Sequence, residues 1–520
     1  MIIINTKPGK WSRNLMKQQH RRTKSPFRVL PSWSKTLIGA ASAFTLLLGP
    51  IQPALAAEAT NDQTLLEVYH LLLDKHYSQP TEDALLKGAV QGMLDTLDDP
   101  FTNYMSADEY QNFVKSINQQ YAGIGATLEV LPEQAALRIS ELLPNMPAAE
   151  AGLAAGDLIT DIDGVKLTKD SVNQATSKLR GKEGSQVTLG VKRGTKTWSV
   201  TVTRKAIQLP TVGSSDLGSG VAYIRITSFA EDTASEFAKV LGSVQKNQPK
   251  GLVLDLRSNG GGYVQGALEI ADMFMKQGPI LIVHENGQAV SLEAEPDGTD
   301  LPLTILIDGN TASASEMLAG ALQKSGRAKL VGVTSYGKGT MQSPFLLPDG
   351  SELKVSIDRW ALPDGTSIDR KGLTPDLRIE RPDTAVNAAM QLLIPDRSQT
   401  LTMLLGKTEA KLNGTNDLTG VPAAMKASNT VYLPLRFVLE TFACELKWTQ
   451  GTPVISFTYN GTLFTVNTKT HAVTANGKIL QAPNGVRDFN GMAYVSSEVL
   501  KAITGKAPLL NPSSVTVYSK

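Results

Sequence analysis

Two continuous runs of apolar residues, each ended by a charge, constrain the fold of this chain more than any other feature. They are KGLVLDLR, residues 250–257, and PLTILID, residues 302–308. Strands buried on both faces of a parallel sheet have this composition, whereas strands with one solvated face alternate apolar and polar residues. A small-residue loop and a helical stretch follow each run, so the pattern predicts an α/β core over residues 207–395. Its chemistry is expected beyond the carboxyl ends of the strands.

A lysine loop, VGVTSYGKGTMQ at residues 331–342, is compatible with two kinds of site. A phosphate-binding loop needs Ser or Thr directly after the lysine, to ligate Mg²⁺. The pattern fits up to Lys338, but Gly339 stands at the hydroxyl position. Pro344 and Pro348 then predict a strand and hairpin instead of the required helix. We therefore interpret Lys338 as part of a hydrolytic site, where a neutral lysine acts as a base.

A serine stands where the second apolar run gives way to a helix. Ser313 has an alanine on each side, so a substrate carbonyl can approach it, and the free N–H groups of the first helical turn can hold an oxyanion. The alternative is that Thr311, Ser313 or Ser315 only caps the helix, because Ser and Thr are common caps. The segment by itself favours capping, and a nucleophile also needs a base.

Lysine is the best candidate for that base. The α/β region has one histidine, His284, in a strand-like segment with no motif around it. The pKa of lysine would have to fall by roughly 3 units from about 10.4, or about 4 kcal/mol, which burial away from anions can supply. Since residues 334–342 contain no acid, we expect no local carboxylate to keep Lys338 charged. Gln342 could orient the amine without restoring its charge.

The flanking segments have other patterns. Residues 58–117 predict amphipathic helices, and residues 118–206 predict a β-rich module with two helices. Residues 396–520 predict a small α+β unit with hairpin turns at Asn460-Gly461 and Asn476-Gly477. The predicted architecture is therefore an α/β core with an inserted β-rich domain, an N-terminal helical segment and a C-terminal α+β domain.

Residues 1–57 have the layout of a secretory signal. Nine Lys and Arg without an acid precede an apolar stretch that ends in Ala54-Leu55-Ala56, a small-x-small cleavage pattern. The alternative is an uncleaved membrane anchor, although Pro50 and Pro53 shorten the apolar span below the roughly 20 residues that a spanning helix needs. Both alternatives predict a secreted or extracytoplasmic protein, attached or not to the membrane or cell wall. Without those nine residues, the chain has 42 basic and 49 acidic residues, and this excess of acidic residues disfavours nucleic-acid binding.

Six ordered stretches resemble the C-terminal processing peptidases, tail-specific serine proteases with a Ser-Lys-Gln site and a PDZ domain. The resemblance covers about residues 62–380. The stretches are GAVQGMLDTLDDPFTNYMSADEY, YAGIGATLEV with AEAGLAAGDLITDIDG, LVLDLRSNGGG, TASASEMLAGALQ, YGKGTMQ and LPDGTSIDRKGLTPD. The C-terminal unit resembles the stalk domain named after the N-terminal region of copper amine oxidases. It has one histidine and no Cys-His cluster, so no metal or cofactor is expected.

The resemblance implies roles for individual residues of the core. Ser313 would be the nucleophile, and Lys338 the general base that later protonates the leaving amine. Gln342 would position Lys338. The oxyanion hole would consist of the backbone N–H groups of Ala314 and of Gly262, the last glycine of NGGG.

The PDZ-like module is expected to bind a peptide C-terminus as an added strand beside ATLEV. The N–H groups of the loop at Gly123, Ile124 and Gly125 would bind the terminal carboxylate. A helix over residues 170–179 would line the groove. Arg180, at its end, could contact the protease domain and report ligand binding.

The residues and the resemblance together predict a secreted or surface-attached serine endopeptidase, which cuts proteins presented through exposed C-termini. The competing prediction is a catalytically silent scaffold, in which the PDZ and stalk domains only bind peptides. The N-terminal helices could pair two chains into a homodimer, and the stalk-like domain could bind a cell-surface partner.

Overall fold

The computed structural model describes residues 61–285, 288–414, 416–449, 451–482 and 484–519. The signal or anchor predicted in residues 1–57 lies outside the described residues. Within the described ranges, no helix is long and apolar enough to span a bilayer. Described residues 61–106 and 344–355 form one unit, and the remaining described residues form a second one.

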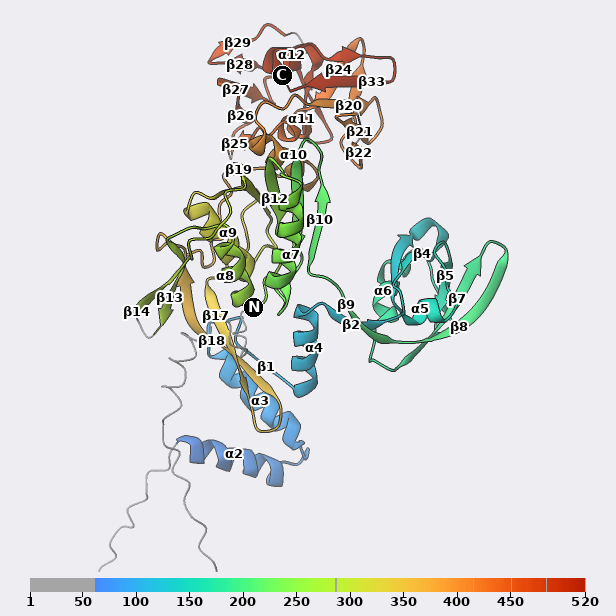
Figure 1. Cartoon of the computed structure of the whole chain (residues 1–520), viewed down its shortest axis with the longest axis vertical. Helices are drawn as coiled ribbons and strands as arrows, with labels where there is room; N and C mark the ends of the chain where they lie inside the picture. Colours follow the sequence, from blue (N-terminus) through green and yellow to red (C-terminus); the bar gives the residue numbers. More distant parts are fainter. Residues whose placement is uncertain (1–60, 286–287, 415, 450, 483, 520) are drawn as a thin grey trace, which may run out of the picture. The chain divides into compact units, whose positions relative to one another are not determined.

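A six-stranded sheet lies at the centre of the α/β core, in the order β10-β11-β12-β15-β16-β19. Figure 1 shows its strands β10 and β12 beside α7. β10 pairs antiparallel with β11, and every other neighbouring pair is parallel. All five residues of β12 and all five of β15 are buried, as the two apolar runs predict. The strands are β10 (Val212–Asp216), β11 (Val221–Ile226), β12 (Gly251–Asp255), β15 (Leu303–Ile307), β16 (Ala328–Gly332) and β19 (Leu377–Arg378).

Alternate residues of these strands enter two different hydrophobic clusters, which explains why the runs are apolar throughout. Leu252 and Leu254 pack with residues of α7, α8 and α9, whereas Val253 and Leu306 pack with residues of α10. Side chains alternate across a strand, so the two clusters lie on opposite faces of the sheet. The helices are α7 (Thr233–Lys246), α8 (Val264–Asp272), α9 (Ala314–Lys324) and α10 (Pro382–Leu393).

Strands, and not a helix, follow the lysine loop. β16 ends at Gly332, and β17 (Thr340–Leu346) then pairs with β18 (Glu352–Ala361). The predicted strand and hairpin are confirmed, and the helix that a phosphate-binding loop would need is replaced by β17. β18 also pairs antiparallel with β13 (Pro279–Glu285), which in turn pairs with β14 (Gln288–Glu293).

The β-rich module is inserted into the chain between two paired strands. β2 leads into it and β9 leads out, and these strands pair antiparallel, so both ends of the module lie side by side. The hydrophobic cluster inside includes Ile139, Ile159 and Leu189 from the sheet, with Val172 and Ala175 from α6. The elements are β2 (Gln120–Gly123), β3 (Ala126–Leu131), β4 (Ala136–Leu142), α5 (Pro147–Glu150), β5 (Leu158–Ile162), β6 (Val165–Lys166), α6 (Val172–Leu179), β7 (Gln186–Arg193), β8 (Lys196–Thr203) and β9 (Lys205–Gln208).

The N-terminal segment is helical, as predicted, with one short strand. α2 (Asn61–Lys75) and α3 (Glu82–Asp95) contain no buried residue. β1 (Asn103–Met105) pairs with β18 in the same unit, at Asn103↔Lys354. α4 (Ala107–Ile117) follows and precedes the inserted module.

The C-terminal unit repeats a strand-to-helix element. β24 (Thr430–Pro434) runs into α11 (Leu435–Thr441), β31 (Met492–Ser496) runs into α12 (Ser497–Thr504), and the two strands pair antiparallel. The predicted hairpin turns are confirmed, because Asn460-Gly461 joins β26 to β27 and Asn476-Gly477 joins β28 to β29. The other strands are β20 (Thr400–Leu404), β21 (Glu409–Leu412), β22 (Asn416–Thr419), β23 (Met425–Ala427), β25 (Lys447–Trp448), β26 (Val454–Tyr459), β27 (Thr462–Asn467), β28 (Val473–Ala475), β29 (Lys478–Ile479), β30 (Val486–Phe489), β32 (Leu509–Leu510) and β33 (Ser514–Tyr518).

Candidate active site

Ser313 occupies the N-cap position of α9 with an unusual backbone. Its φ is 60° and its ψ is −119°, whereas an N-cap residue normally has extended dihedral angles. Backbone strain of this kind costs about 1–3 kcal/mol and persists where surrounding contacts impose it. Ser313 is fully buried, and Ala314 begins the helix, so the N–H of Ala314 has no partner within α9. A serine that only capped the helix would not need this strain.

The glycine loop that follows β12 lies directly against this serine. At Gly261, φ is +98°, and a Cβ there would lie 2.9 Å from Ser313 Cβ and 3.0 Å from Ala314 N. Any residue with a side chain would therefore displace the serine or the first turn of α9. The contact requires glycine.

Gly262 lies against a different part of the core. Its φ is +145°, and a Cβ there would lie 2.2 Å from Phe229 O. Phe229 and Gly262 form a parallel bridge, which uses the N–H groups of Phe229 and Tyr263. The N–H of Gly262 therefore takes no part in the bridge. The two predicted oxyanion donors are therefore close in the structure. Ala314 N lies against Gly261, and Gly262 follows Gly261 in the chain.

A buried amide holds the glycine loop in place. Asn259 Nδ2 donates to Ile226 O at 3.0 Å, and its Oδ1 accepts from Gly261 N at 2.9 Å. Its backbone carbonyl accepts from Ala312 N and from Ser315 Oγ, both at 3.0 Å. Asn259 thus ties the loop to the residues on both sides of the serine. No local pattern in the sequence marked this side chain as part of the site.

The buried carboxylate of Glu316 connects the serine to the lysine loop. Its Oε2 accepts from Ser313 N and from Lys338 N, each at 2.9 Å. Its Oε1 accepts from Gly337 N at 2.7 Å and from Ser335 Oγ. Because one oxygen binds both N–H groups, the backbones of Ser313 and Lys338 lie within two hydrogen bonds of each other. The structure therefore brings these two predicted site residues together.

Glu316 also corrects an expectation from the sequence. Residues 334–342 contain no acid, yet α9 supplies a carboxylate to this segment from outside. A carboxylate has about four acceptor sites, and the four donors named above are neutral groups that occupy them. The sequence did hold a signal for this contact, because Ser313-Ala-Ser-Glu316 matches the capping-box pattern, in which the glutamate binds the N-cap N–H.

Lys338 lies in a tightly packed loop. Its residue is 6% exposed, and its carbonyl accepts from Trp360 Nε1 at 3.1 Å. A Cβ on Gly337, where φ is +90°, would lie 2.7 Å from a backbone nitrogen, and one on Gly339 would lie 2.5 Å from Asp369 Cβ. The two flanking glycines therefore allow neighbouring segments to close over the lysine.

The amide of Gln342 is fixed by two hydroxyl groups. Its Nε2 donates to Thr340 Oγ1 at 2.9 Å and to Ser356 Oγ at 3.1 Å. Among the residues that the structure describes, nothing donates to its buried Oε1. Since the donors of Gln342 are engaged, its open carbonyl oxygen is suited to accept a hydrogen bond from an amine.

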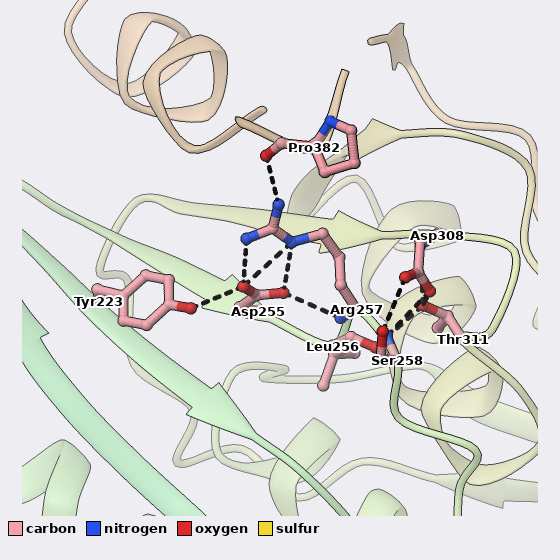
Figure 2. Close-up of polar contacts among 8 residues, drawn as sticks. All are labelled: Tyr223, Asp255, Leu256, Arg257, Ser258, Asp308, Thr311 and Pro382. Carbon is pink, nitrogen blue, oxygen red and sulfur yellow. Dashed lines mark hydrogen bonds and ion pairs between the residues drawn. The ribbon is translucent and has the colours of Figure 1, made fainter. Parts of the chain in front are cut away.

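A buried ion pair supports the start of the glycine loop (Figure 2). Arg257 Nη2 donates to Asp255 Oδ2 at 2.7 Å, Tyr223 Oη donates to the same oxygen at 2.6 Å, and Arg257 Nη1 donates to Pro382 O at 2.7 Å. Burial alone would raise the pKa of Asp255, but the hydrogen bonds and charge of Arg257 outweigh it and hold that pKa below its ordinary value. Burial, and then the bond to Asp255, raises the pKa of Tyr223 to about 12.

A second set of contacts in Figure 2 joins the loops after β12 and β15. Asp308 accepts from Ser258 N at 3.0 Å and from Ser258 Oγ at 3.2 Å. Thr311 Oγ1 donates to Leu256 O at 3.0 Å. The loop that carries the glycines and the loop that carries Ser313 are therefore cross-linked at their starts.

In the PDZ-like module, the predicted carboxylate loop follows β2, which ends at Gly123. The carbonyl of Ile124 accepts from Ala148 N at 2.8 Å, and the carbonyl of Gly125 accepts from Leu143 N at 3.0 Å. The module itself thus engages both carbonyls. Gly125 has a φ of +79°, a conformation that favours glycine.

Arg180 lies at the end of α6, next to the strand that leads into the module. Its guanidinium lies 4.1 Å from the ring centroid of Tyr121 in β2, a cation–π distance. Gly181 N also donates to Ala122 O at 3.1 Å. The helix expected to line the peptide groove is therefore tied to β2.

Four family models match this chain. That of peptidase family S41 matches residues 220–379, and that of the PDZ domain matches residues 138–193. The model described as the activating protease CtpB N-terminal domain matches residues 52–109. The copper amine oxidase N-terminal domain matches residues 387–457 and 411–518.

Two relatives from Bacillus subtilis (strain 168) share long stretches with this chain. The carboxy-terminal processing protease CtpB is 37% identical over 355 residues, 66% of this chain and 74% of the relative. The carboxy-terminal processing protease CtpA is 33% identical over 325 residues, 62% of this chain and 69% of the relative. The solved structure of a photosystem II D1 C-terminal processing protease has a TM-score of 0.39 at 26% identity, over 62% of this chain and 88% of that one.

Proposed function

Because this chain belongs to peptidase family S41, as a serine peptidase of the carboxy-terminal processing kind with a PDZ domain, we propose that Ser313 and Lys338 form its catalytic dyad. Ser313 is the nucleophile, Lys338 is the general base, and Gln342 orients the amine of Lys338. The N–H groups of Gly262 and Ala314 form the oxyanion hole.

In the proposed reaction, Ser313 Oγ attacks the carbonyl carbon of the scissile peptide bond. Its proton passes to the neutral amine of Lys338. The two oxyanion N–H groups hold the negative oxygen of the tetrahedral intermediate. The Lys338 ammonium then protonates the leaving amine, and an acyl-enzyme remains. Lys338 next takes a proton from water, which attacks the ester, and Ser313 leaves with its proton restored.

One observation carries this proposal: a single oxygen of Glu316 accepts hydrogen bonds from both Ser313 N and Lys338 N. The contact links residues 25 positions apart in the sequence. It supports a shared role, because a cap alone would not need the lysine loop.

Cleavage of an unstructured protein with an apolar C-terminus tests the proposal. Ser313→Ala and Lys338→Met should each abolish turnover, whereas Ser325→Ala, at the other end of α9, should leave it unchanged. A lysine base predicts activity that rises toward alkaline pH, and a plateau already reached at pH 5 would argue against Lys338. If the wild type binds the protein but cuts nothing, the alternative of a silent peptide-binding scaffold is correct.

The proposed substrates enter through their C-termini. The N–H groups of Gly123, Ile124 and Gly125 would bind the terminal carboxylate, and the peptide would pair with β3. Arg180 would report this binding, and its contact with Tyr121 supports a route through β2. We expect Arg180→Ala to change how far a PDZ-binding peptide stimulates cleavage; an unchanged stimulation ratio rules this role out.

The proposed partner of the N-terminal helices is a second copy of this chain. Apolar residues on α2 are exposed, among them Leu66 at 58% and Leu71 at 51%, and neither α2 nor α3 buries a residue. Exposed apolar faces of this kind mark interaction surfaces. Sedimentation should show a dimer that Leu66→Glu dissociates and that Leu463→Glu, an exposed leucine of the C-terminal unit, leaves intact. A monomeric wild type would refute the pairing.

We also propose that the protein acts outside the cytoplasm, attached there through its C-terminal unit to a surface partner. The basic and apolar layout of residues 1–57 supports this location. Cell fractionation tests it, with deletion of residues 396–520 as the comparison. A cytoplasmic pool of full-length protein would contradict the location, and unchanged attachment after the deletion would contradict the role of the C-terminal unit.

A further inference from the structure

A buried carboxylate of the C-terminal unit binds the protease core. Glu440, in α11, is fully buried. It accepts from Glu380 N at 3.2 Å and from Arg381 N at 3.0 Å. These N–H groups precede α10, which starts at Pro382, so the carboxylate lies at a helix N-terminus, where a negative charge is stabilised. Arg436 completes its contacts with a hydrogen bond of 2.8 Å from Nη1.

The same turn of the core contacts the support of the glycine loop. Pro382 O accepts from Arg257 Nη1 at 2.7 Å, and Arg257 pairs with Asp255 at the end of β12. Figure 2 shows Arg257 between Asp255 and Pro382. Glu440 therefore binds the N–H groups of the two residues that directly precede Pro382, and the carbonyl of Pro382 binds Arg257. The chain from Arg257 leads directly into the glycines that lie against Ser313.

Other contacts fix α11 on α10. The Arg381 guanidinium lies 5.3 Å from the ring centroid of Phe437, and Asn387 Nδ2 donates to Thr441 O. Phe437 and Thr441 are buried. The C-terminal unit is thus docked on α10 by several contacts, and the carboxylate of Glu440 binds the backbone of the turn beside Arg257.

We propose that Glu440 is a positioning residue of the peptidase. It fixes residues 380–382, and through Pro382 and Arg257 it holds the glycine loop beside Ser313. The C-terminal unit is then part of the support of the active site, in addition to any role in attachment. This inference rests on the proposed function, in which Ser313 is the nucleophile.

The test compares full-length variants at a temperature where all of them are folded. Glu440→Ala removes both acceptor oxygens. Glu440→Gln keeps one of them and takes the place of the alanine variant if that variant does not fold. Glu498→Gln is the matched control, because Glu498 is an exposed carboxylate on α12, the repeat counterpart of α11. We expect Glu440→Ala to lower kcat about tenfold or more, because small displacements of catalytic groups have effects of this size. KM should change less than about twofold, because the contacts that bind the substrate are unaltered.

A double-mutant cycle with Arg257→Ala separates positioning from stability alone. If Glu440 acts through Arg257, Glu440→Ala should lower kcat much less in the Arg257→Ala background than in the wild type. Equal fold-changes in the two backgrounds, or a wild-type kcat in Glu440→Ala with only a lower unfolding temperature, would overturn the inference. Ser313→Ala is measured beside them: if it is inactive while Glu440→Ala keeps full kcat, the proposed function stands and this inference falls. If Ser313→Ala stays active, both fall.

Discussion

Replacement of Glu316 by glutamine tests the contact that joins the serine to the lysine loop. The change keeps the shape of the side chain but turns one acceptor oxygen into a donor. If the amide nitrogen replaces Oε2, the N–H groups of Ser313 and Lys338 lose their acceptor; if it replaces Oε1, Gly337 and Ser335 lose theirs. Each buried donor left without a partner costs about 1–3 kcal/mol, so the pair costs about 2–6 kcal/mol.

Two measurements follow from this magnitude. For a core of roughly 200 residues, each kcal/mol shifts Tm by about 2–4 °C, so Tm of Glu316→Gln should fall by roughly 4–24 °C. Well below that temperature, kcat should fall about 100-fold, because the serine and the lysine would no longer be held in register. Glu269→Gln on α8, a half-buried carboxylate that binds one glutamine side chain, is the control. A Glu316→Gln enzyme with wild-type Tm and kcat would refute the reasoning.

The pKa of Asp255 is lower in the folded state than in the unfolded chain, so the stability it contributes is present above the unfolded pKa and is lost as the pH falls through the folded pKa. The free energy of unfolding should therefore fall as the pH drops below about 4. Acid unfolding followed by circular dichroism should be shallower for Asp255→Asn, and equal slopes would contradict this. Gly261→Ala places a methyl group 2.9 Å from Ser313 Cβ and should lower kcat about 100-fold in a peptide-cleavage assay; unchanged kcat would mean that the loop moves freely. Gly125→Ala puts a side chain where φ is +79° and 2.2 Å from Met146 Cβ, so the loop has to shift. Calorimetry on the full-length protein should then show about tenfold weaker binding of a C-terminal peptide; equal affinity would place the carboxylate elsewhere.

Local patterns in the sequence predicted most elements of the α/β core. β12 is apolar except for its last residue, Asp255, and β15 is apolar except for Thr304. Both strands have this composition because helices cover both faces of the sheet. The turns at Asn460-Gly461 and Asn476-Gly477 were predictable for a similar reason, since few residues adopt the positive φ that tight hairpins need. These features depend on neighbours close in the chain.

The acceptors that organise the candidate site were not predictable in the same way. Glu316 and Glu440 accept from backbone N–H groups of distant segments, at Lys338 and Arg381, and the backbone carbonyl of Asn259 accepts from Ala312 N. A backbone N–H is the same group in every residue except proline, so nothing in the letters of the partner segment marks it as a partner. Only the capping-box pattern at Ser313 pointed to one of these contacts, the local one.

By itself, the sequence therefore determined the order of strands and helices, the glycines at strained turns, and the chemical types of the candidate serine, lysine and glutamine. The tertiary structure decided which groups meet: Gly261 against Ser313, one carboxylate oxygen between Ser313 and Lys338, and a glutamate of the C-terminal unit on the turn beside Arg257. The physical reason is range. Periodicity and turn preferences act over a few residues, whereas these contacts join segments that only the folded sheet and its helices bring within hydrogen-bond distance.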